Sequence, residues 1–479
     1  MGIITIDLDI RRRIKELGKH TSIYSLSSVA QSAMSFFLLP LYVNKFTTSE
    51  YGAYTLLLMC SGIGSAIFYL GINSALPSSY YEYSDEIDRE KVFNASFYLT
   101  LAGAILLSIL GLTIASPLSE LIFNTPDYRW HIVVSCISSS FYILNQLILT
   151  YYRLKKKSVL VAGTSFASVA ANLILVYVLL TFSNLGVWAP ILTTVFIQII
   201  VFGIYFVNIG SCLRHGIMKR EISAQMRFGI LTVLSGLAAM AIEWSDRIFL
   251  KNILSLADVG VYSLALRLGS IATPLLITPF AMVWRPMIME LKNDTKNAQL
   301  VKHVLVLYCL ASFAVILGSQ LFTIDVFRWF VKTTEYHRAS SLVPIVAAGI
   351  MAGGLMNITC MGYLYVGKIG KMAVPYYICA PLSLLLNWQL IPRFGLSGAA
   401  FTSLLINVLL PTLSYTGIRS HFHLPVDWFR IAKIACLFAL ANILIRYFQL
   451  NVRDGHLLAK IFIITLFLYG GVYFAVGGK

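Results

Sequence analysis

Apolar runs of about 20 residues recur along the whole sequence, and they limit its fold more than any other feature. An α-helix needs a run of about that length to cross the hydrocarbon core of a bilayer, which is about 30 Å thick. Of the 479 residues, 58% are hydrophobic and 12% are charged, whereas a soluble domain has about 25% charged residues. We therefore expect an all-α polytopic membrane protein.

The runs predict about 14 transmembrane helices. They lie at about residues 21–42, 51–72, 92–116, 130–151, 158–180, 186–209, 226–250, 259–283, 301–323, 341–366, 372–391, 396–418, 429–448 and 457–476. A basic, amphipathic segment precedes them and is expected to lie on the membrane surface. The predicted organisation is this segment (1–20), an N-lobe of six helices (21–210), a linker (211–225), a C-lobe of six helices (226–420) and two additional C-terminal helices (421–479).

The basic residues indicate the orientation in the membrane. A formal net charge of +16 could point to nucleic acid, but the excess Lys and Arg lie in short loops, of which 153–157 is the most basic. The loops on the side of the N-terminus hold most of them, so that side is predicted to be cytoplasmic. With an even number of helices, both termini are expected there. The first run is a full span, which favours a retained first helix over a cleaved signal peptide.

The seven cysteines form no CxxC pair. We interpret them as packing residues rather than metal ligands or disulfide partners. No metal or other cofactor is predicted.

The sequence contains an internal repeat. FTTSEYGAYTLLL (46–58) matches LSLADVGVYSLAL (254–266), so that Glu50, Gly52 and Tyr54 correspond to Asp258, Gly260 and Tyr262 at an offset of 208 residues. LGVWAPILTTVFIQ (185–198) matches FGLSGAAFTSLLIN (394–407) at an offset of 209 residues. The second match pairs Gly186, Thr193 and Gln198 with Gly395, Thr402 and Asn407.

Each repeat contains six spans and enters the membrane from the same side. Parallel repeats of this kind are related by a pseudo-two-fold axis along the membrane normal, with a central site between the lobes. The repeat therefore predicts an alternating-access transporter.

Three stretches, taken in order, carry a resemblance to a known family: LPLYVNKFTTSEYGAYTLLL, SDRIFLKNILSLADVGVYSLALRL and LNWQLIPRFGLSGAAFTSLL. Together they resemble the polysaccharide-transport branch of the multidrug/oligosaccharidyl-lipid/polysaccharide exporter superfamily. Within that branch, the chain is most similar to bacterial O-antigen flippases and related flippases of lipid-linked oligosaccharides.

The resemblance implies a flippase in the bacterial cytoplasmic (inner) membrane. Its substrate would be an undecaprenyl-pyrophosphate-linked oligosaccharide, such as an O-antigen repeat unit of lipopolysaccharide, moved from the cytoplasmic to the periplasmic leaflet. It also implies membrane lipids, an O-antigen polymerase and a chain-length regulator as partners, and it implies no role for nucleic acid.

Two arginines are candidates for binding the diphosphate. Arg267 lies within the predicted span 259–283, and Arg247 lies near the outer end of the span 226–250. The guanidinium fork can bind two phosphate oxygens at once. Alternatively, Arg247 reaches the interface and Arg267 pairs with Asp246 or Glu243 as part of the structure.

Glu243, Asp246 and Arg247 follow i, i+3 and i+4 spacing on one helix face, where Glu243 can pair with Arg247. The acids are candidates for coupling transport to an H⁺ or Na⁺ gradient, because desolvation moves the titration of a carboxylate towards neutral pH. The alternative is a neutralised structural ion pair, which the family resemblance favours for Asp246.

Further polar residues within the spans are candidates for binding the glycan: Asn145, Gln146, Asn172, Asn357 and Asn387. For any one of them, an interhelical hydrogen bond is the simpler interpretation.

Two other classes of protein compete with the flippase. A multidrug/cation antiporter of the same superfamily would use acids in its binding lobe, and Glu243 and Asp246 keep it open. A membrane enzyme acting on the same lipid carrier would need a sizeable outer loop with catalytic residues. The predicted loops are short and contain no such constellation, so the chain is not predicted to be an enzyme.

Overall fold

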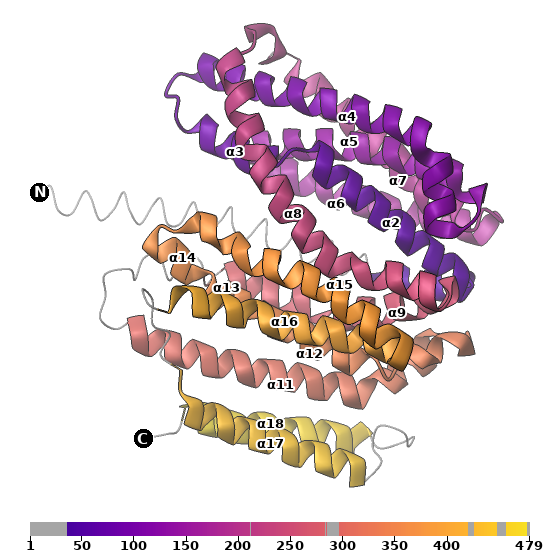
Figure 1. Cartoon of the computed structure of the whole chain (residues 1–479), viewed down its shortest axis with the longest axis vertical. Helices are drawn as coiled ribbons and strands as arrows, with labels where there is room; N and C mark the ends of the chain where they lie inside the picture. The colour runs from indigo at the N-terminus through magenta and orange to yellow at the C-terminus, as the bar shows by residue number, and fades with distance from the viewer. Residues whose placement is uncertain are drawn as a thin grey trace, which may run out of the picture. The chain divides into compact units, whose positions relative to one another are not determined.

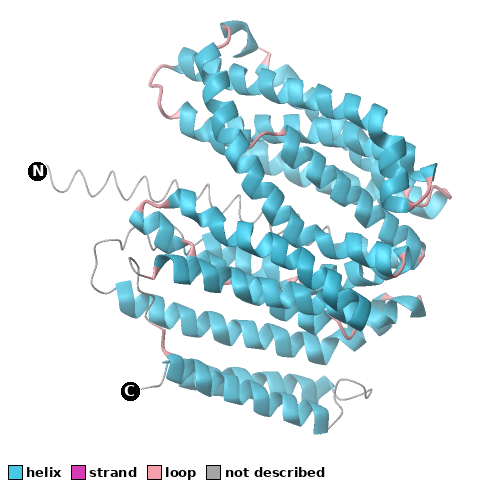
Figure 2. Cartoon of the chain, viewed as in Figure 1, coloured by secondary structure: helices cyan, strands magenta, loops and turns pink. Residues whose placement is uncertain are grey.

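The structure is a computed structural model that describes residues 36–210, 212–282, 284, 297–419, 426–447 and 457–476. Every regular element in this part of the chain is a helix (Figure 2). Thirteen helices among the described residues are long and apolar enough to cross a membrane. The predicted all-α membrane fold is therefore confirmed. The predicted surface segment (1–20) and most of the first predicted span (21–42) lie outside the described residues.

The chain divides into two compact units. Unit 1 comprises Met1–Phe46 and Ala53–Met240, and unit 2 comprises Thr47–Gly52 and Ala241–Lys479. This division falls at Met240, inside a long helix, and the predicted lobes with their linker 211–225 stay a prediction. Two helices thus contribute to both units, because Thr47–Gly52 also begins a helix whose remainder belongs to unit 1.

Unit 1 is built from long helices joined by short turns (Figure 1). Its elements are α2 (Thr48–Phe68), α3 (Ile72–Tyr80), α4 (Glu86–Phe123), η1 (Pro126–Tyr128), α5 (Arg129–Leu154), α6 (Ser158–Phe182), α7 (Trp188–Ile209), η2 (Cys212–His215) and the first part of α8 (Lys219–Ile253). At 1.5 Å per residue, the 38 residues of α4 extend about 57 Å. Because that exceeds the hydrocarbon thickness, the charged first turn of α4 can lie outside the lipid.

Unit 2 contains the second part of α8 and the remaining helices (Figure 1). These are α9 (Leu256–Gly269), the π-helix η3 (Thr273–Ile277), α11 (Asn297–Phe330), η4 (Thr334–Ala339), α12 (Val343–Gly354), α13 (Met356–Thr359), α14 (Met361–Val366), η5 (Ile369–Ala373), α15 (Val374–Phe394), α16 (Leu396–Ile418), α17 (Trp428–Tyr447) and α18 (Leu457–Val476). The predicted span 341–366 is therefore broken into three pieces.

The two units repeat the same packing pattern. In unit 1, α5 packs against both α4 and α7, and in unit 2 the equivalent α12 packs against both α11 and α16. The turn before α7 contains Gly186 with φ 49°, and the turn before α16 contains Gly395 with φ 58°. Glycine reaches this left-handed region at no steric cost, which explains why both repeats have glycine there. The repeat read from the sequence is present in the fold.

Two equivalent glycines also allow a close helix crossing within unit 2. A Cβ on Gly52 would collide with the carbonyl oxygen of Leu256, and a Cβ on Gly260 would collide with that of Thr48. Gly52 and Gly260 correspond in the repeat, and so do Thr48 and Leu256, so the contact is reciprocal. The starts of α2 and α9 approach at backbone distance because neither has a side chain at the crossing.

The C-terminal helices α17 and α18 pack on α11 (Figure 1). Their apolar contacts include Leu317 and Ile434. An ion pair secures the hairpin at each end: the Nζ of Lys460 lies 2.6 Å from Asp325, and the Nζ of Lys302 lies 3.1 Å from Asp427. The side chain of Lys460 is 4% exposed, so this pair anchors the two additional helices to unit 2.

The glycine crossing predicts that unit 2 tolerates no side chain there. Gly260→Ala places a Cβ against backbone, which cannot move as a side chain can, so we expect a loss of about 1–3 kcal/mol of unfolding free energy. Gly163→Ala is the control, because a Cβ at that helical position has nothing within 4 Å. Thermal unfolding of the purified variants in detergent measures the difference, and equal midpoints would contradict the crossing.

Candidate functional site

Helix α9 places Arg267 within a candidate membrane span. The helix begins after Ser255, whose hydroxyl accepts a hydrogen bond from the backbone N–H of Asp258 at 3.1 Å, an N-cap interaction. Residues 259–265 are all buried, but Arg267 is exposed. It stands near the middle of the candidate span Leu256–Met282.

No acid among the described residues forms an ion pair with Arg267. A charged side chain at mid-bilayer costs about 3 kcal/mol or more unless it is paired or faces water. At this depth, an exposed guanidinium without an ion-pair partner among the described residues therefore needs a polar environment. Its N–H groups are available to donate hydrogen bonds to an anion. This answers one alternative from the sequence: Arg267 is not neutralised by Asp246 or Glu243.

Arg247 has a different environment. Its Nη1 lies 3.3 Å from a carboxylate oxygen of Asp246 and donates to the main-chain carbonyl of Glu243 at 2.6 Å. Its guanidinium carbon lies 4.4 Å from the ring centroid of Trp244. The Asp246 side chain is 7% exposed and that of Arg247 is 11% exposed. The structure thus shows an ion pair between Asp246 and Arg247.

Glu243 lies on the exposed side of α8. Arg247 contacts its backbone carbonyl, and among the described residues the carboxylate of Glu243 forms no ion pair. The pairing of Glu243 with Arg247 that the spacing suggested is therefore replaced by the pair with Asp246. Glu243 remains as an accessible carboxylate within the candidate span Lys219–Ile253.

Asn387 joins α15 to α8. Its Nδ2 donates to the hydroxyl of Ser245 at 3.0 Å, and that hydroxyl lies 3.3 Å from the hydroxyl of Ser383. All three side chains are buried, and the Oδ1 of Asn387 has no donor among the described residues. Sequence reasoning missed Ser245 and Ser383, although the i, i+4 spacing of Ser383 and Asn387 on one helix face was a usable signal.

Two of the other polar candidates, Asn145 and Asn357, form hydrogen bonds within the helix bundle. Asn145 of α5 donates to the carbonyl and side-chain oxygens of Gln198 on α7, at 2.9 and 2.7 Å. Asn357 donates to the carbonyl of Gly354 at 3.1 Å. Gln146 and Asn172 are half-buried. Within unit 2, no hydrogen bond between described residues joins Asn357 or Asn387 to Arg267, and a glycan site shared by the five candidates stays a prediction.

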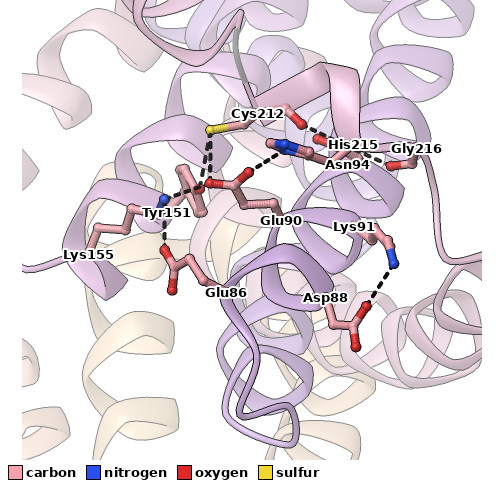
Figure 3. Close-up of polar contacts among 10 residues, drawn as sticks. All are labelled: Glu86, Asp88, Glu90, Lys91, Asn94, Tyr151, Lys155, Cys212, His215 and Gly216. Atoms are coloured by element: carbon pink, nitrogen blue, oxygen red, sulfur yellow. Dashed lines mark hydrogen bonds and ion pairs between the residues drawn. The ribbon is translucent and has the colours of Figure 1, made fainter.

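A second polar cluster lies at one end of unit 1, where α4, α5 and η2 meet (Figure 3). The Nζ of Lys155 lies 3.0 Å from carboxylate oxygens of both Glu86 and Glu90. The other oxygen of Glu90 lies 2.6 Å from the Nδ1 of His215, and the Sγ of Cys212 lies 3.5 Å from Glu90. Burial opposes the charge of Lys155, but hydrogen bonds to Tyr151 and the two acids raise its pKa.

This cluster holds the predicted linker to unit 1. Asn94 of α4 donates to the carbonyls of Cys212 and Gly216 at 2.9 and 2.8 Å (Figure 3). At the end of the linker, Ser96 donates to Gln225 at 2.8 Å. Tyr83 donates to Glu221 at 2.9 Å, and this hydrogen bond raises the pKa of Tyr83. The chain from η2 through the start of α8 is thus part of unit 1, which explains why the units divide farther along α8.

Comparisons with solved structures identify the fold. The chain superposes on a structure titled "Lipid II flippase MurJ, inward closed conformation" with a TM-score of 0.74 and 14% identity, covering 95% of this chain and 98% of that one. A multidrug resistance MATE family transporter of the MOP superfamily, in its inward-facing conformation, gives 0.66 and 14%, with 84% and 94% covered. A mutant of the Vibrio cholerae MATE transporter VcmN gives 0.60 and 16%, with 86% and 98% covered.

The chain thus has the multi-pass helical fold of these flippase and transporter structures. The profile of the family described as "Polysaccharide biosynthesis protein" matches residues 17–292. The chain belongs to that family, as the resemblance in the sequence indicated. No curated protein matches the chain significantly.

The polar cluster of unit 1 predicts a specific loss of stability. Lys155→Ala leaves two carboxylates without their shared cation, and the side chain of Glu90 is 12% exposed. We expect a loss of about 1–3 kcal/mol of unfolding free energy, because a hydrogen bond between charged groups contributes about that much and Glu90 keeps its contact with His215 but loses Lys155. Lys156→Ala is the matched control, because Lys156 is an exposed neighbour. Thermal unfolding compares them, and an equal effect of the two changes would show that the cluster is not stabilising.

Proposed function

We propose that the protein is a flippase for an undecaprenyl-pyrophosphate-linked oligosaccharide, which it moves from the cytoplasmic to the periplasmic leaflet by alternating access. The observation that carries this proposal is Arg267, an exposed arginine near the middle of a membrane span, with no ion-pair partner among the described residues. Membership of a polysaccharide biosynthesis family supports a glycan cargo. A similar structure is named as a flippase of lipid II, which supports a lipid carrier.

The chemistry of the cargo matches that arginine. A lipid-linked glycan has a hydrated, anionic diphosphate between an apolar tail and a polar sugar. Moving that diphosphate through the bilayer needs compensating donors at mid-depth, because isolated charges are costly there. A guanidinium binds phosphate oxygens in pairs and stays charged. Arg267 is therefore proposed as the diphosphate anchor, while Arg247 is already occupied by Asp246.

The proposed cargo also implies a cellular location and partner proteins. We place the protein in the bacterial cytoplasmic membrane with both termini in the cytoplasm, as the loop charges suggest. A polymerase and a chain-length regulator are the expected partners on the product side. The polymerase and the chain-length regulator follow from the family resemblance.

The proposal is tested by translocation in liposomes of a fluorescent undecaprenyl-pyrophosphate oligosaccharide. Arg267→Ala should lower the rate at least tenfold, because it removes the anchoring cation. Arg267→Lys should retain part of the rate, since it keeps the charge but loses the paired donors. Arg393→Ala, at an exposed arginine in the last turn of α15, should leave the rate unchanged.

Equal losses in Arg267→Ala and Arg393→Ala would remove Arg267 from the site. A wild-type protein that moves no lipid but exchanges protons for a cationic dye would replace the flippase with the antiporter. That alternative is supported by Glu243, an accessible carboxylate within the candidate span of α8.

We further propose that Glu243 couples transport to an H⁺ or Na⁺ gradient. Of the two candidate acids, Asp246 is neutralised by Arg247, whereas Glu243 is exposed and free to bind an ion. A carboxylate that is charged when unloaded and neutral when loaded changes the cost of exposing this face to lipid. Because of this difference in cost, an ion gradient would favour one conformation of the transport cycle over the other.

The two acids should respond differently to loss of charge. Glu243→Gln should preserve folding but make the transport rate insensitive to an imposed pH or Na⁺ gradient. Asp246→Asn should lower the unfolding free energy by about 3 kcal/mol or more, because it leaves the Arg247 cation buried without its partner. Gradient-jump transport and thermal unfolding separate the two effects. A gradient response that persists in Glu243→Gln would rule out this coupling role.

A further inference from the structure

The short helix η4 forms an unusual contact with the beginning of α2. Tyr336 donates its hydroxyl hydrogen to the carbonyl of Thr47 at 3.0 Å, and Thr48 donates its own to a carboxylate oxygen of Glu335 at 2.8 Å. The rings of Tyr51 and Tyr336 meet edge to face with centroids 6.2 Å apart. Thr47–Gly52 belongs to unit 2 with η4, while the rest of α2 belongs to unit 1.

The same loop also holds the start of α9. Arg338 at the C-terminal end of η4 lies 3.1 Å from Asp258, the acid in the first turn of α9. One six-residue helix thus contacts the two helix starts that cross at Gly52 and Gly260. At those glycines the two helices contact each other through backbone atoms, without interdigitating side chains. The helices can therefore separate there without any interdigitated side chain having to be unpacked.

The internal repeat provides a comparison. Thr125, Asp127 and Tyr128 of the η1 loop correspond to Thr333, Glu335 and Tyr336 at the offset of 208 residues. In the η1 loop, Thr125 donates to Asp127 at 2.5 Å, and Tyr128 stacks on Phe123 with centroids 4.2 Å apart. The equivalent acid and tyrosine of η4 reach the start of α2 instead.

From this asymmetry we infer that η4 is a releasable latch, in which Glu335 and Tyr336 hold the start of α2 on unit 2 during one part of the transport cycle. The inference rests on the proposed alternating access. Tyr336 and Thr48 are buried, with 0% and 4% of their surface exposed, but Glu335 itself is exposed. When the latch opens, water can therefore take the place of the Thr48 hydroxyl as hydrogen-bond donor to Glu335. The Thr48–Glu335 hydrogen bond is thus reversible.

The latch is tested by crosslinking. In a variant with the seven native cysteines replaced, Thr48→Cys and Glu335→Cys are joined by a short, reducible bis-thiol reagent. Translocation of the lipid-linked probe should fall at least tenfold and recover on reduction. The matched control joins Thr125→Cys to Asp127→Cys in the equivalent loop of unit 1, which should leave transport unchanged. Undiminished transport by the crosslinked 48–335 protein would overturn the latch.

A second measurement does not depend on the cargo. Glu335→Ala and Tyr336→Phe should each raise amide hydrogen exchange in residues 47–52 several-fold, because they remove one hydrogen bond that holds this segment. Asp127→Ala, the equivalent change in η1, should leave that exchange as in the wild type. Equal exchange in Glu335→Ala and Asp127→Ala would overturn the latch even if the wild type transports the probe. Raised exchange with no transport of the probe would instead leave the latch standing and count against the proposed cargo.

Discussion

The cost of a charge in lipid is the constraint on which the described structure depends. Hydrocarbon provides no water, so a charged side chain inside a span must be paired or must face a polar space. Asp246 and Arg247 meet this constraint by pairing, and so do Lys460 and Asp325. Arg267 has no such pair among the described residues, and this exception is the reason why we propose it as a functional residue.

Close approach of helices is the second physical theme. Membrane helices gain little from hydrophobic burial against one another, so small residues and interhelical hydrogen bonds determine where they meet. Gly52 and Gly260 permit contact at backbone distance. The hydrogen bonds of Asn145 to Gln198 and of Asn387 to Ser245 fix helix pairs in unit 1 and unit 2, respectively. The Nδ2 groups of Asn145 and Asn387 thus serve contacts between helices, and a role of either residue in binding the cargo stays a prediction.

The sequence predicted the fold class and the repeat because both depend on regular patterns. Apolar runs about 20 residues long can satisfy their backbone in lipid only as helices, and the repeated glycines mark turns that need positive φ. The partners of polar side chains could not be predicted in the same way. The i, i+4 spacing allowed Glu243 as the partner of Arg247, but the structure pairs Arg247 with its neighbour Asp246, the structural ion pair that the family resemblance favoured. The division inside α8 was also hidden, because it depends on α4 and α5, which are distant from the linker in sequence.

Differences between the repeats carry more information about function than their similarities. The Asn145–Gln198 contact of unit 1 corresponds to Gly353 and Asn407 in unit 2, where a Cβ on the glycine would lie 2.5 Å from the asparagine oxygen. One repeat uses a hydrogen bond at this position and the other uses close packing. The same divergence separates Asp127, which bonds within its own loop, from Glu335, whose longer side chain reaches Thr48. A duplicated fold begins with equivalent positions. Where substitutions break the equivalence, as in η4, we therefore expect one half to perform a task that the other does not.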